Sequence, residues 1–337
     1  MKWAPLLLFL CCCNLVSGQD DQLLASWIEY AKSEVVVIAP AGLNLRDKPT
    51  VKSEILRAVP FGEKVKIIGS GHYRRDTVGA IDFYYSAPDR LAPISTPIPI
   101  SGYWLKVDYQ GTIGYMFTAY LDVAVNTRLD GDESMNRDFI LLFPYNGCFS
   151  NYTYHAGYHW YGYYKTGTGI SVKKIDVSFY NLIDQELIAG NTKKVVSCSD
   201  NKFLQFIIGS KEPIALPVNN SKIIQGALYD EGTGTIEDSI LQQSNISLQF
   251  KPKTTYPNLE KLVLIYSGKQ QIIDLPDGID SDGCYLVCCG DLDGDKKDDY
   301  IFGYGAKFSK TILYLSKPAE KGKLLKPVAV FYSGYCC

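Results

Sequence analysis

Short apolar runs separated by turn residues dominate this chain. Residues 35–38, 139–143 and 262–266 are continuous apolar runs, which are typical of buried strands. Residues 175–180 alternate apolar and polar side chains, with the period of two expected of a strand that has two different faces. No long helical period lies between these runs, so a parallel sheet built from strand–helix–strand units is not expected. The pattern therefore predicts a mostly β protein with antiparallel sheets.

The same pattern divides the chain into two parts. The polar and acidic stretch at residues 126–136 predicts a boundary between a first β domain at 34–124 and a larger, sandwich-like β domain at 137–337. In the larger domain, residues 262–273 predict a hairpin with a glycine turn. A second hairpin is expected around the acidic loop at residues 291–299.

The N-terminus has the features of an export signal. Lys2 precedes an apolar stretch, residues 4–16, that is too short to span a bilayer. Cleavage after Gly18 would remove residues 1–18, and lipidation of one of the cysteines at 11–13 is the alternative. Apolar residues at three- and four-residue spacing then predict a short helix within residues 19–33. We expect an exported protein, periplasmic, cell-surface or secreted, without a membrane span.

Cysteine usage fits an exported chain, because disulfides persist outside the cytoplasm. Cleavage removes three of the ten cysteines and leaves seven, so at least one thiol is expected to be unpaired or to link two chains. A spare thiol predicts disulfide-linked self-association as one option. The connectivity stays open, and the order along the chain allows Cys148 with Cys198, and one of Cys284, Cys288 and Cys289 with Cys336 or Cys337.

Four motifs in the first domain are shared with a known family. Residues 43–49 read LNLRDKP, and residues 104–107, 114–117 and 120–121 read WLKV, GYMF and YL. This set resembles the bacterial SH3 domain, whose opening motif is L-N-[VLM]-R-x-x-P. The resemblance implies a small SH3-like β-barrel in an exported protein, with a cell-wall peptide or glycan as ligand. The candidate ligand-binding residues are aromatic: Trp104, Tyr115, Tyr84 and Tyr85, with a core position as the alternative for Trp104.

Residues 72–102 depart from this family as a long insertion between two expected strands. The insertion holds four prolines, which favour an extended backbone, and the aromatic run at residues 83–85. Loops of this length are usually functional or flexible. Two interpretations remain open at this point: a flap that faces a ligand, or a segment that packs on the neighbouring domain.

The acidic stretch at residues 291–299 reads DLDGDKKDD. Clustered carboxylates repel one another unless solvent or a cation screens them, and calcium takes six to eight oxygen ligands. The stretch resembles the integrin-type FG-GAP calcium loop, D-x-[DN]-x-[DN]-x-x-x-D, with Lys296 where that family usually has glycine. The resemblance implies a structural calcium ion, and a solvated acidic turn without metal is the alternative. The implied ligands are the side chains of Asp291, Asp293, Asp295 and Asp299 and the main-chain carbonyl of Lys297.

Aromatic residues are concentrated at residues 152–164. On strand alternation, the even-numbered residues are expected in a core, and the odd-numbered ones, including Tyr161 and Tyr163, are the better candidates for exposure. An exposed aromatic face would suit a sugar or peptide, whereas the alternative is sandwich core. His155 and His159 are four apart, but no third metal ligand can be named, so packing roles are expected for them.

Composition and motifs limit the function further. The net charge of -2 gives no basic surplus, so a nucleic-acid partner is not expected. A cysteine peptidase needs a histidine several tens of residues after its cysteine, and the histidines after Cys148 follow too soon. We therefore expect a non-catalytic, calcium-stabilised protein that binds a cell-envelope peptide or glycan. The alternatives are a cell-wall hydrolase with unidentified catalytic residues and a structural envelope assembly protein.

Overall fold

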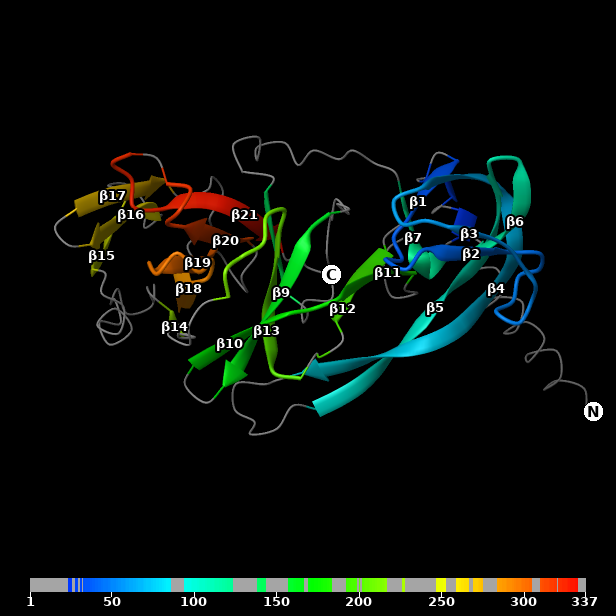
Figure 1. Cartoon of the computed structure of the whole chain (residues 1–337), viewed down its shortest axis with the longest axis horizontal. Coiled ribbons are helices and arrows are strands. Elements are labelled where there is room, and N and C mark those ends of the chain that lie inside the picture. The colour runs from blue at the N-terminus through cyan, green and yellow to red at the C-terminus, as the bar shows by residue number, and fades with distance from the viewer. Residues whose placement is uncertain are drawn as a thin grey trace, which may run out of the picture.

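The computed structural model is built almost wholly from antiparallel strands (Figure 1). The sequence-based prediction of a mostly β protein is therefore confirmed. Few described residues are helical, namely those of the 3₁₀ turn η1 at Thr118–Tyr120 and four positions before residue 30. The structure describes residues 24–25, 28–29, 31, 33–85, 94–123, 138–143, 157–166, 169–183, 192–198, 200, 202–216, 226–227, 247–252, 259–266, 269–274, 284–304, 310–319 and 321–332.

The first domain is a strongly curved seven-stranded sheet with the order β3-β2-β6-β5-β4-β1-β7. Its interior is filled by apolar side chains from most of these strands, including Leu45, Tyr103 and Leu105, which are fully buried. Leu24 and Ala31 also lie in this core, so the described parts of the preceding segment pack on the barrel. The strands are β1 Glu34–Val37, β2 Leu43–Arg46, β3 Ile55–Val59, β4 Lys64–Tyr85, β5 Ile94–Tyr109, β6 Thr112–Phe117 and β7 Leu121–Val123.

The described residues of the expected insertion, 72–85 and 94–102, extend β4 and β5 beyond the barrel as a long antiparallel ribbon (Figure 1). Pairing continues to Tyr85 opposite Ile94, with several bulges on the way. Ile81 and Ile100 are buried against Leu182 of the second domain. The described part of this segment therefore packs on the neighbouring domain.

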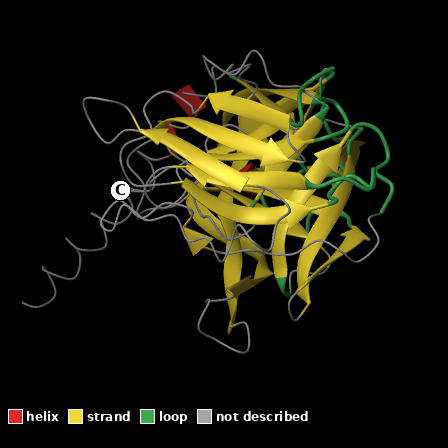
Figure 2. Ribbon diagram, turned by 90° about the vertical axis from the view of Figure 1, so that its left-hand side faces the viewer, coloured by secondary structure: helices red, strands yellow, loops and turns green. Residues whose placement is uncertain are grey.

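The second domain is layered around a central sheet with the order β10-β9-β13-β8. One face of this sheet packs on a C-terminal sheet with the order β14-β18-β19-β20-β21, and the other packs on the two-stranded sheet β11-β12. Figure 2 shows how strands dominate the molecule in a view turned by 90°. The strands are β8 Phe139–Leu142, β9 His159–Thr166, β10 Gly169–Lys174, β11 Val177–Ile183, β12 Thr192–Cys198, β13 Leu204–Ser210, β14 Gly226–Ala227, β18 Cys284–Gly290, β19 Asp299–Tyr304, β20 Lys310–Leu315 and β21 Lys326–Tyr332.

Strand β9 corrects one expectation from the sequence. Tyr161 and Tyr163 were the expected exposed face, but Tyr163 is 0% exposed and both pack between the central and C-terminal sheets. Tyr164 and Trp160 face the other way, toward β11-β12. Both faces of the strand are covered because the central sheet has a layer on each side.

The predicted hairpins are present. β16 Leu259–Tyr266 pairs with β17 Lys269–Asp274, and β15 Ser247–Pro252 completes their three-stranded sheet. β18 and β19 pair on either side of the acidic loop. The expected helix at 19–33 falls largely outside the described residues, and its described positions are too few to define an element.

Strands β11 and β12 lie between the barrel and the central sheet. On β11, Val177 and Phe179 point to the central sheet, whereas Tyr180 and Leu182 pack on the barrel and its ribbon. The amide of Asn181 donates a buried hydrogen bond of 3.0 Å to the main-chain oxygen of Leu121. Strand alternation thus gives this small sheet two apolar faces, and both are buried.

Candidate functional site

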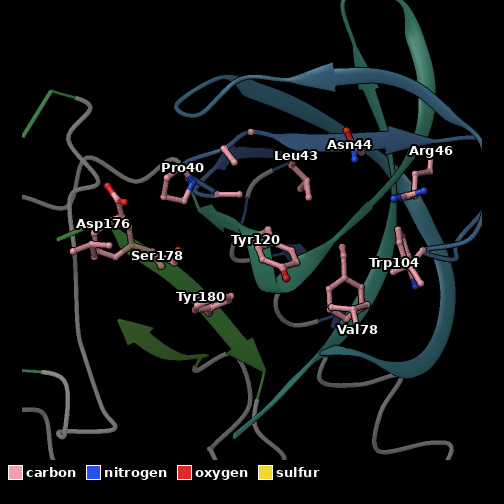
Figure 3. Close-up of a pocket in the computed structure, with 17 residues that line it drawn as sticks. Pro40, Leu43, Asn44, Arg46, Val78, Trp104, Tyr120, Asp176, Ser178 and Tyr180 are labelled. Carbon is pink, nitrogen blue, oxygen red and sulfur yellow. The ribbon is translucent and has the colours of Figure 1, made fainter. Parts of the chain in front are cut away.

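A groove of about 700 Å³ lies where the barrel meets β11 (Figure 3). One wall is β2 and the segment that leads into it, including Pro40, Leu43 and Asn44. The opposite wall is the start of β11, with Asp176, Ser178 and Tyr180. Side chains from β4, β5, β6 and η1 complete the groove: Val78, Trp104, Phe117 and Tyr120.

Aromatic rings form a continuous chain along the groove. Trp104 packs on Phe117 with 5.3 Å between ring centroids, and Phe117 lies 6.4 Å from Tyr120. Tyr120 then meets Tyr180 of β11 at 5.6 Å. The indole N–H of Trp104 donates to Asp76 Oδ2 over 3.1 Å, which fixes the ring. Apolar walls with a few placed polar groups are the usual composition of ligand sites.

The β2 wall is held by local backbone chemistry. Gly42 has a φ of +81°, and an added Cβ would meet the carbonyl oxygen of Val59 at 2.8 Å, so a larger residue does not fit. Arg46 Nη1 donates to the carbonyl oxygen of Ser53 over 2.7 Å and closes the loop that follows β2. Arg46 belongs to the motif at residues 43–49, and Gly42 comes directly before it, so the motif and its flanking residue help to build one wall of the groove.

The four predicted ligand residues have different positions. Trp104 lines the groove but is only 3% exposed, so most of its ring is core. Tyr115 is half-buried beside the same apolar cluster and does not line the groove. Tyr84 and Tyr85 are in the outer part of β4, and their side chains lie outside the described ones. Their role in binding stays a prediction.

Sequence reasoning missed most of the groove. The motifs assign Asn44, Arg46 and Tyr120 to the SH3-like barrel without a predicted role in binding. The sequence pattern places Asp176 and Tyr180 only in one alternating strand. That alternation indicated two faces, but it carried no signal that one face would meet the barrel.

The acidic loop between β18 and β19 brings three predicted ligands together. Asp291, Asp293 and Asp299 each offer a carboxylate oxygen, and these oxygens lie within 4.8 Å of one another. Asp299 is fully buried, and its two oxygens accept main-chain N–H groups of Leu292 and Ser316 at 2.9 and 2.8 Å. Three carboxylates at this spacing form a concentrated negative site that a hard cation would suit.

The electrostatics of the loop are unfavourable for three ionised carboxylates. Burial, followed by the charge of Asp293, raises the pKa of Asp299 to about 8. Burial also raises the pKa of Asp293, with the neighbouring Asp295 as the second cause. Both shifts mean that the folded protein without a cation disfavours the charged form.

The other two predicted ligands have different contacts. Asp295 Oδ2 accepts the hydroxyl of Ser316 over 2.8 Å and lies 3.6 Å from Lys297 Nζ. Asp295 is not among the three carboxylates that converge. The role of the Lys297 carbonyl as a metal ligand stays a prediction. Lys296 has a φ of +68°, a left-handed conformation that glycine adopts more easily.

The loop is fixed to the rest of the second domain. The hydroxyl of Tyr163 donates to the main-chain oxygen of Leu292 over 2.5 Å, within the core. Gly294 has a φ of +82° and lies so close to Ala215 that a Cβ would be 1.9 Å from its carbonyl oxygen. The aromatic strand β9 and the segment at Ala215 therefore hold the loop in place.

Three cysteines of the second domain whose side chains are described, Cys198, Cys288 and Cys289, are buried thiols. Cys198 donates to the carbonyl oxygen of Asp200 over 3.0 Å, and burial raises the pKa of Cys198 and of Cys288. Cys289 is a buried thiol as well. The partners considered from the sequence, Cys148, Cys336 and Cys337, lie outside the described residues, so the disulfide pattern stays a prediction.

Comparison with known proteins supports the first domain. Residues 41–122 match the bacterial SH3 domain family, which confirms the resemblance seen in the four motifs. No curated protein and no solved structure matches the chain. The family match does not extend to residues 291–299, so calcium binding there stays a prediction. Within the described part of the chain, no helix is long and apolar enough to cross a membrane.

Proposed function

We propose that this is an exported, non-catalytic protein that binds a cell-envelope peptide or glycan in the groove between the SH3-like barrel and β11. The observation that carries the proposal is the aromatic chain Trp104, Phe117, Tyr120 and Tyr180 along a groove of about 700 Å³. Flat rings pack against sugar faces and against peptide planes. Bacterial SH3 domains commonly bind cell-wall components, which favours this ligand class.

Polar groups in the groove support recognition as well as burial. Asn44, Ser178 and the hydroxyl groups of Tyr120 and Tyr180 stand among the apolar walls. A groove of this size, with apolar walls and a few polar groups, is typical of sites that fix the orientation of a small ligand or a short segment of a larger one.

Retention on isolated peptidoglycan tests the proposal with a matched pair of variants. Val51 is 47% exposed and lines the groove, whereas Ile113 is 53% exposed and lies elsewhere on the barrel. We expect Val51→Glu to lose retention, because it removes an apolar contact and places a charge in the groove. Ile113→Glu is expected to be retained like the unaltered protein. Equal retention of both variants, or no retention of the unaltered protein, would refute the proposal.

The same assay addresses the outer part of the ribbon. Asp82 pairs with Pro97 in the register of β4 and β5, so residues 83–96 can be replaced by a short glycine-containing turn. This change removes Tyr84 and Tyr85 but keeps Ile81, which packs on the second domain. If these tyrosines contact the ligand, retention falls. Unchanged retention confines the site to the groove.

We also propose that the acidic loop binds a calcium ion that stabilises the second domain. The donor set fits, because calcium prefers carboxylate oxygens and Asp291, Asp293 and Asp299 present theirs within 4.8 Å. The raised pKa of the buried Asp299 supports the fit, since it shows that the negative charge of this carboxylate is poorly compensated in the folded protein. A bound ion would neutralise the cluster and tie β18 to β19. Asp295 and the Lys297 carbonyl are the further ligands implied by the loop's resemblance.

A further inference from the structure

The two charged side chains of the groove are separated along its length. Asp176, just before β11, is at one end, and Arg46 of β2 is near Trp104 at the other, with Leu43 and Tyr120 between them (Figure 3). The two charges come from different domains, because Asp176 lies well beyond the matched SH3 segment at 41–122. The groove therefore has an acidic end, an aromatic middle and a basic end.

Both charged groups retain binding capacity. Asp176 is exposed, and within the part of the chain that the structure describes no hydrogen bond or ion pair to its carboxylate is found. Arg46 is half-buried and uses Nη1 to hold the carbonyl oxygen of Ser53. A guanidinium has five N–H donors in a planar fork, so further donors remain that can hold a carboxylate.

We propose that the groove is a composite site for a short zwitterionic peptide. Asp176 of the second domain binds the ammonium end, and Arg46 of the barrel binds the carboxylate end. This inference rests on the proposed function and narrows its ligand class. A neutral N-acetylated glycan would match the aromatic middle but would leave both charged ends without a counterpart. The charge pattern therefore favours the peptide.

Strand β11 supports the proposal by its geometry. Its even-numbered side chains Ser178 and Tyr180 face the groove, whereas Phe179 packs in T-shaped contact with Trp160 of the central sheet, 5.6 Å between centroids. Asn181 bonds to the main chain at Leu121. The wall that carries Asp176 is thus anchored on both sides, and the ligand would meet a preformed acidic end.

Calorimetric titration of the full mature chain with tri-, tetra- and pentaalanine tests the proposal. These probes have free termini and minimal side chains, and each is compared with its N-acetylated and its C-amidated form. We expect the free peptide to bind about tenfold more tightly than either capped form, the size expected for one charge-assisted hydrogen bond in a partly enclosed groove. A chitin oligosaccharide serves as the neutral glycan probe.

A protein variant assigns the ammonium end. In Asp176→Asn the advantage of the free peptide over its N-acetylated form should disappear, while the effect of C-amidation persists. Glu212→Gln, an exposed change outside the groove, should behave like the unaltered protein. Melting temperatures of both variants check that they are folded.

The outcomes separate this inference from the proposed function. Retention on peptidoglycan together with chitin oligosaccharide binding and no oligoalanine binding overturns the peptide assignment alone. Oligoalanine binding that is unaffected by either cap, or by Asp176→Asn, overturns the composite charge assignment. Absence of retention on peptidoglycan and of binding to every probe defeats the proposed function as well.

Discussion

Calcium is expected to raise the melting temperature of the mature protein. The perturbation is the exchange of chelator for calcium, and it acts on the cluster of Asp291, Asp293 and Asp299. In chelator the three carboxylates share one small volume, and burial together with Asp293 raises the pKa of Asp299 to about 8. A bound cation removes both penalties in the folded state only, because the unfolded chain does not hold the oxygens together.

The size of the effect follows from mass action. Extracellular calcium modules bind at roughly 0.1–1 mM, and a ligand of the folded state stabilises by RT ln(1 + [L]/Kd). At about 10 mM calcium the gain is about 1.4–2.7 kcal/mol. At roughly 2–4 °C per kcal/mol for a unit of this size, the melting temperature should rise by about 3–11 °C.

Differential scanning calorimetry with Asp293→Asn distinguishes binding from general screening. Asp293 Oδ1 accepts the N–H of Asp295 over 3.1 Å, and an amide oxygen keeps that bond while the charge is lost. The variant should therefore melt higher than the unaltered protein in chelator but gain nothing from calcium. Asp298→Asn, in the same loop but outside the converging trio, should keep the calcium response.

Magnesium at equal concentration controls for screening, since it demands a smaller octahedral site and dehydrates reluctantly. A melting temperature that is the same in chelator and in calcium would refute the metal site and leave a solvated acidic turn. An equal increase with magnesium would show that screening alone explains the effect.

Two further predictions concern the same loop. The folded pKa of Asp299 is raised to about 8, so its contribution to stability is fully present below about pH 4 and is lost as the pH rises through about 8. The free energy of unfolding in chelator should therefore fall from about pH 5 to pH 8, as measured by urea titrations at several pH values. Asp293→Asn should make this fall with pH less steep. Gly294→Ala should destabilise by more than Gly322→Ala in urea, because both have left-handed φ values but only Gly294 meets Ala215; equal losses would show that backbone strain alone matters.

The hairpins and the barrel were accessible to sequence reasoning because their signals are local. Residues 43–49 contain β2 and the start of the turn that follows it, and residues 262–273 carry two paired strands and their glycine turn. The ribbon at 72–102 was harder to predict, since Pro97 and Pro99 usually interrupt strands. They are tolerated because they lie two apart on a stretch of β5 beyond its pairing with β6. Residues two apart on a strand present their backbone nitrogens to the same side, and proline is tolerated in a strand where that side is an edge.

The faces of β9 and the groove were not accessible, for a common physical reason. The alternation of side chains along a strand indicates that the strand has two faces. The layer that covers each face is formed by residues far away in the sequence, so the alternation does not predict it. Tyr163 is buried because β18–β21 cover it, and Tyr180 lies in the groove because the barrel covers that side of β11. The resemblance of the acidic loop implied five ligands, and three of their carboxylates converge because Asp291 and Asp293 lie in one turn while Asp299 begins the returning strand.

The position of β11 also determines whether a binding measurement on the isolated barrel would describe the groove of the full chain. A fragment that ends near residue 124 would lack Leu182 and Val195, which cover Ile81 and Ile100 of the ribbon. It would expose that apolar surface and would lose Asp176 together with one wall of the groove. The SH3 motifs identify the barrel, but the surface that is argued to bind arises only when β11 packs against it. Binding measured on the barrel alone would therefore describe a different site from the one in the full chain.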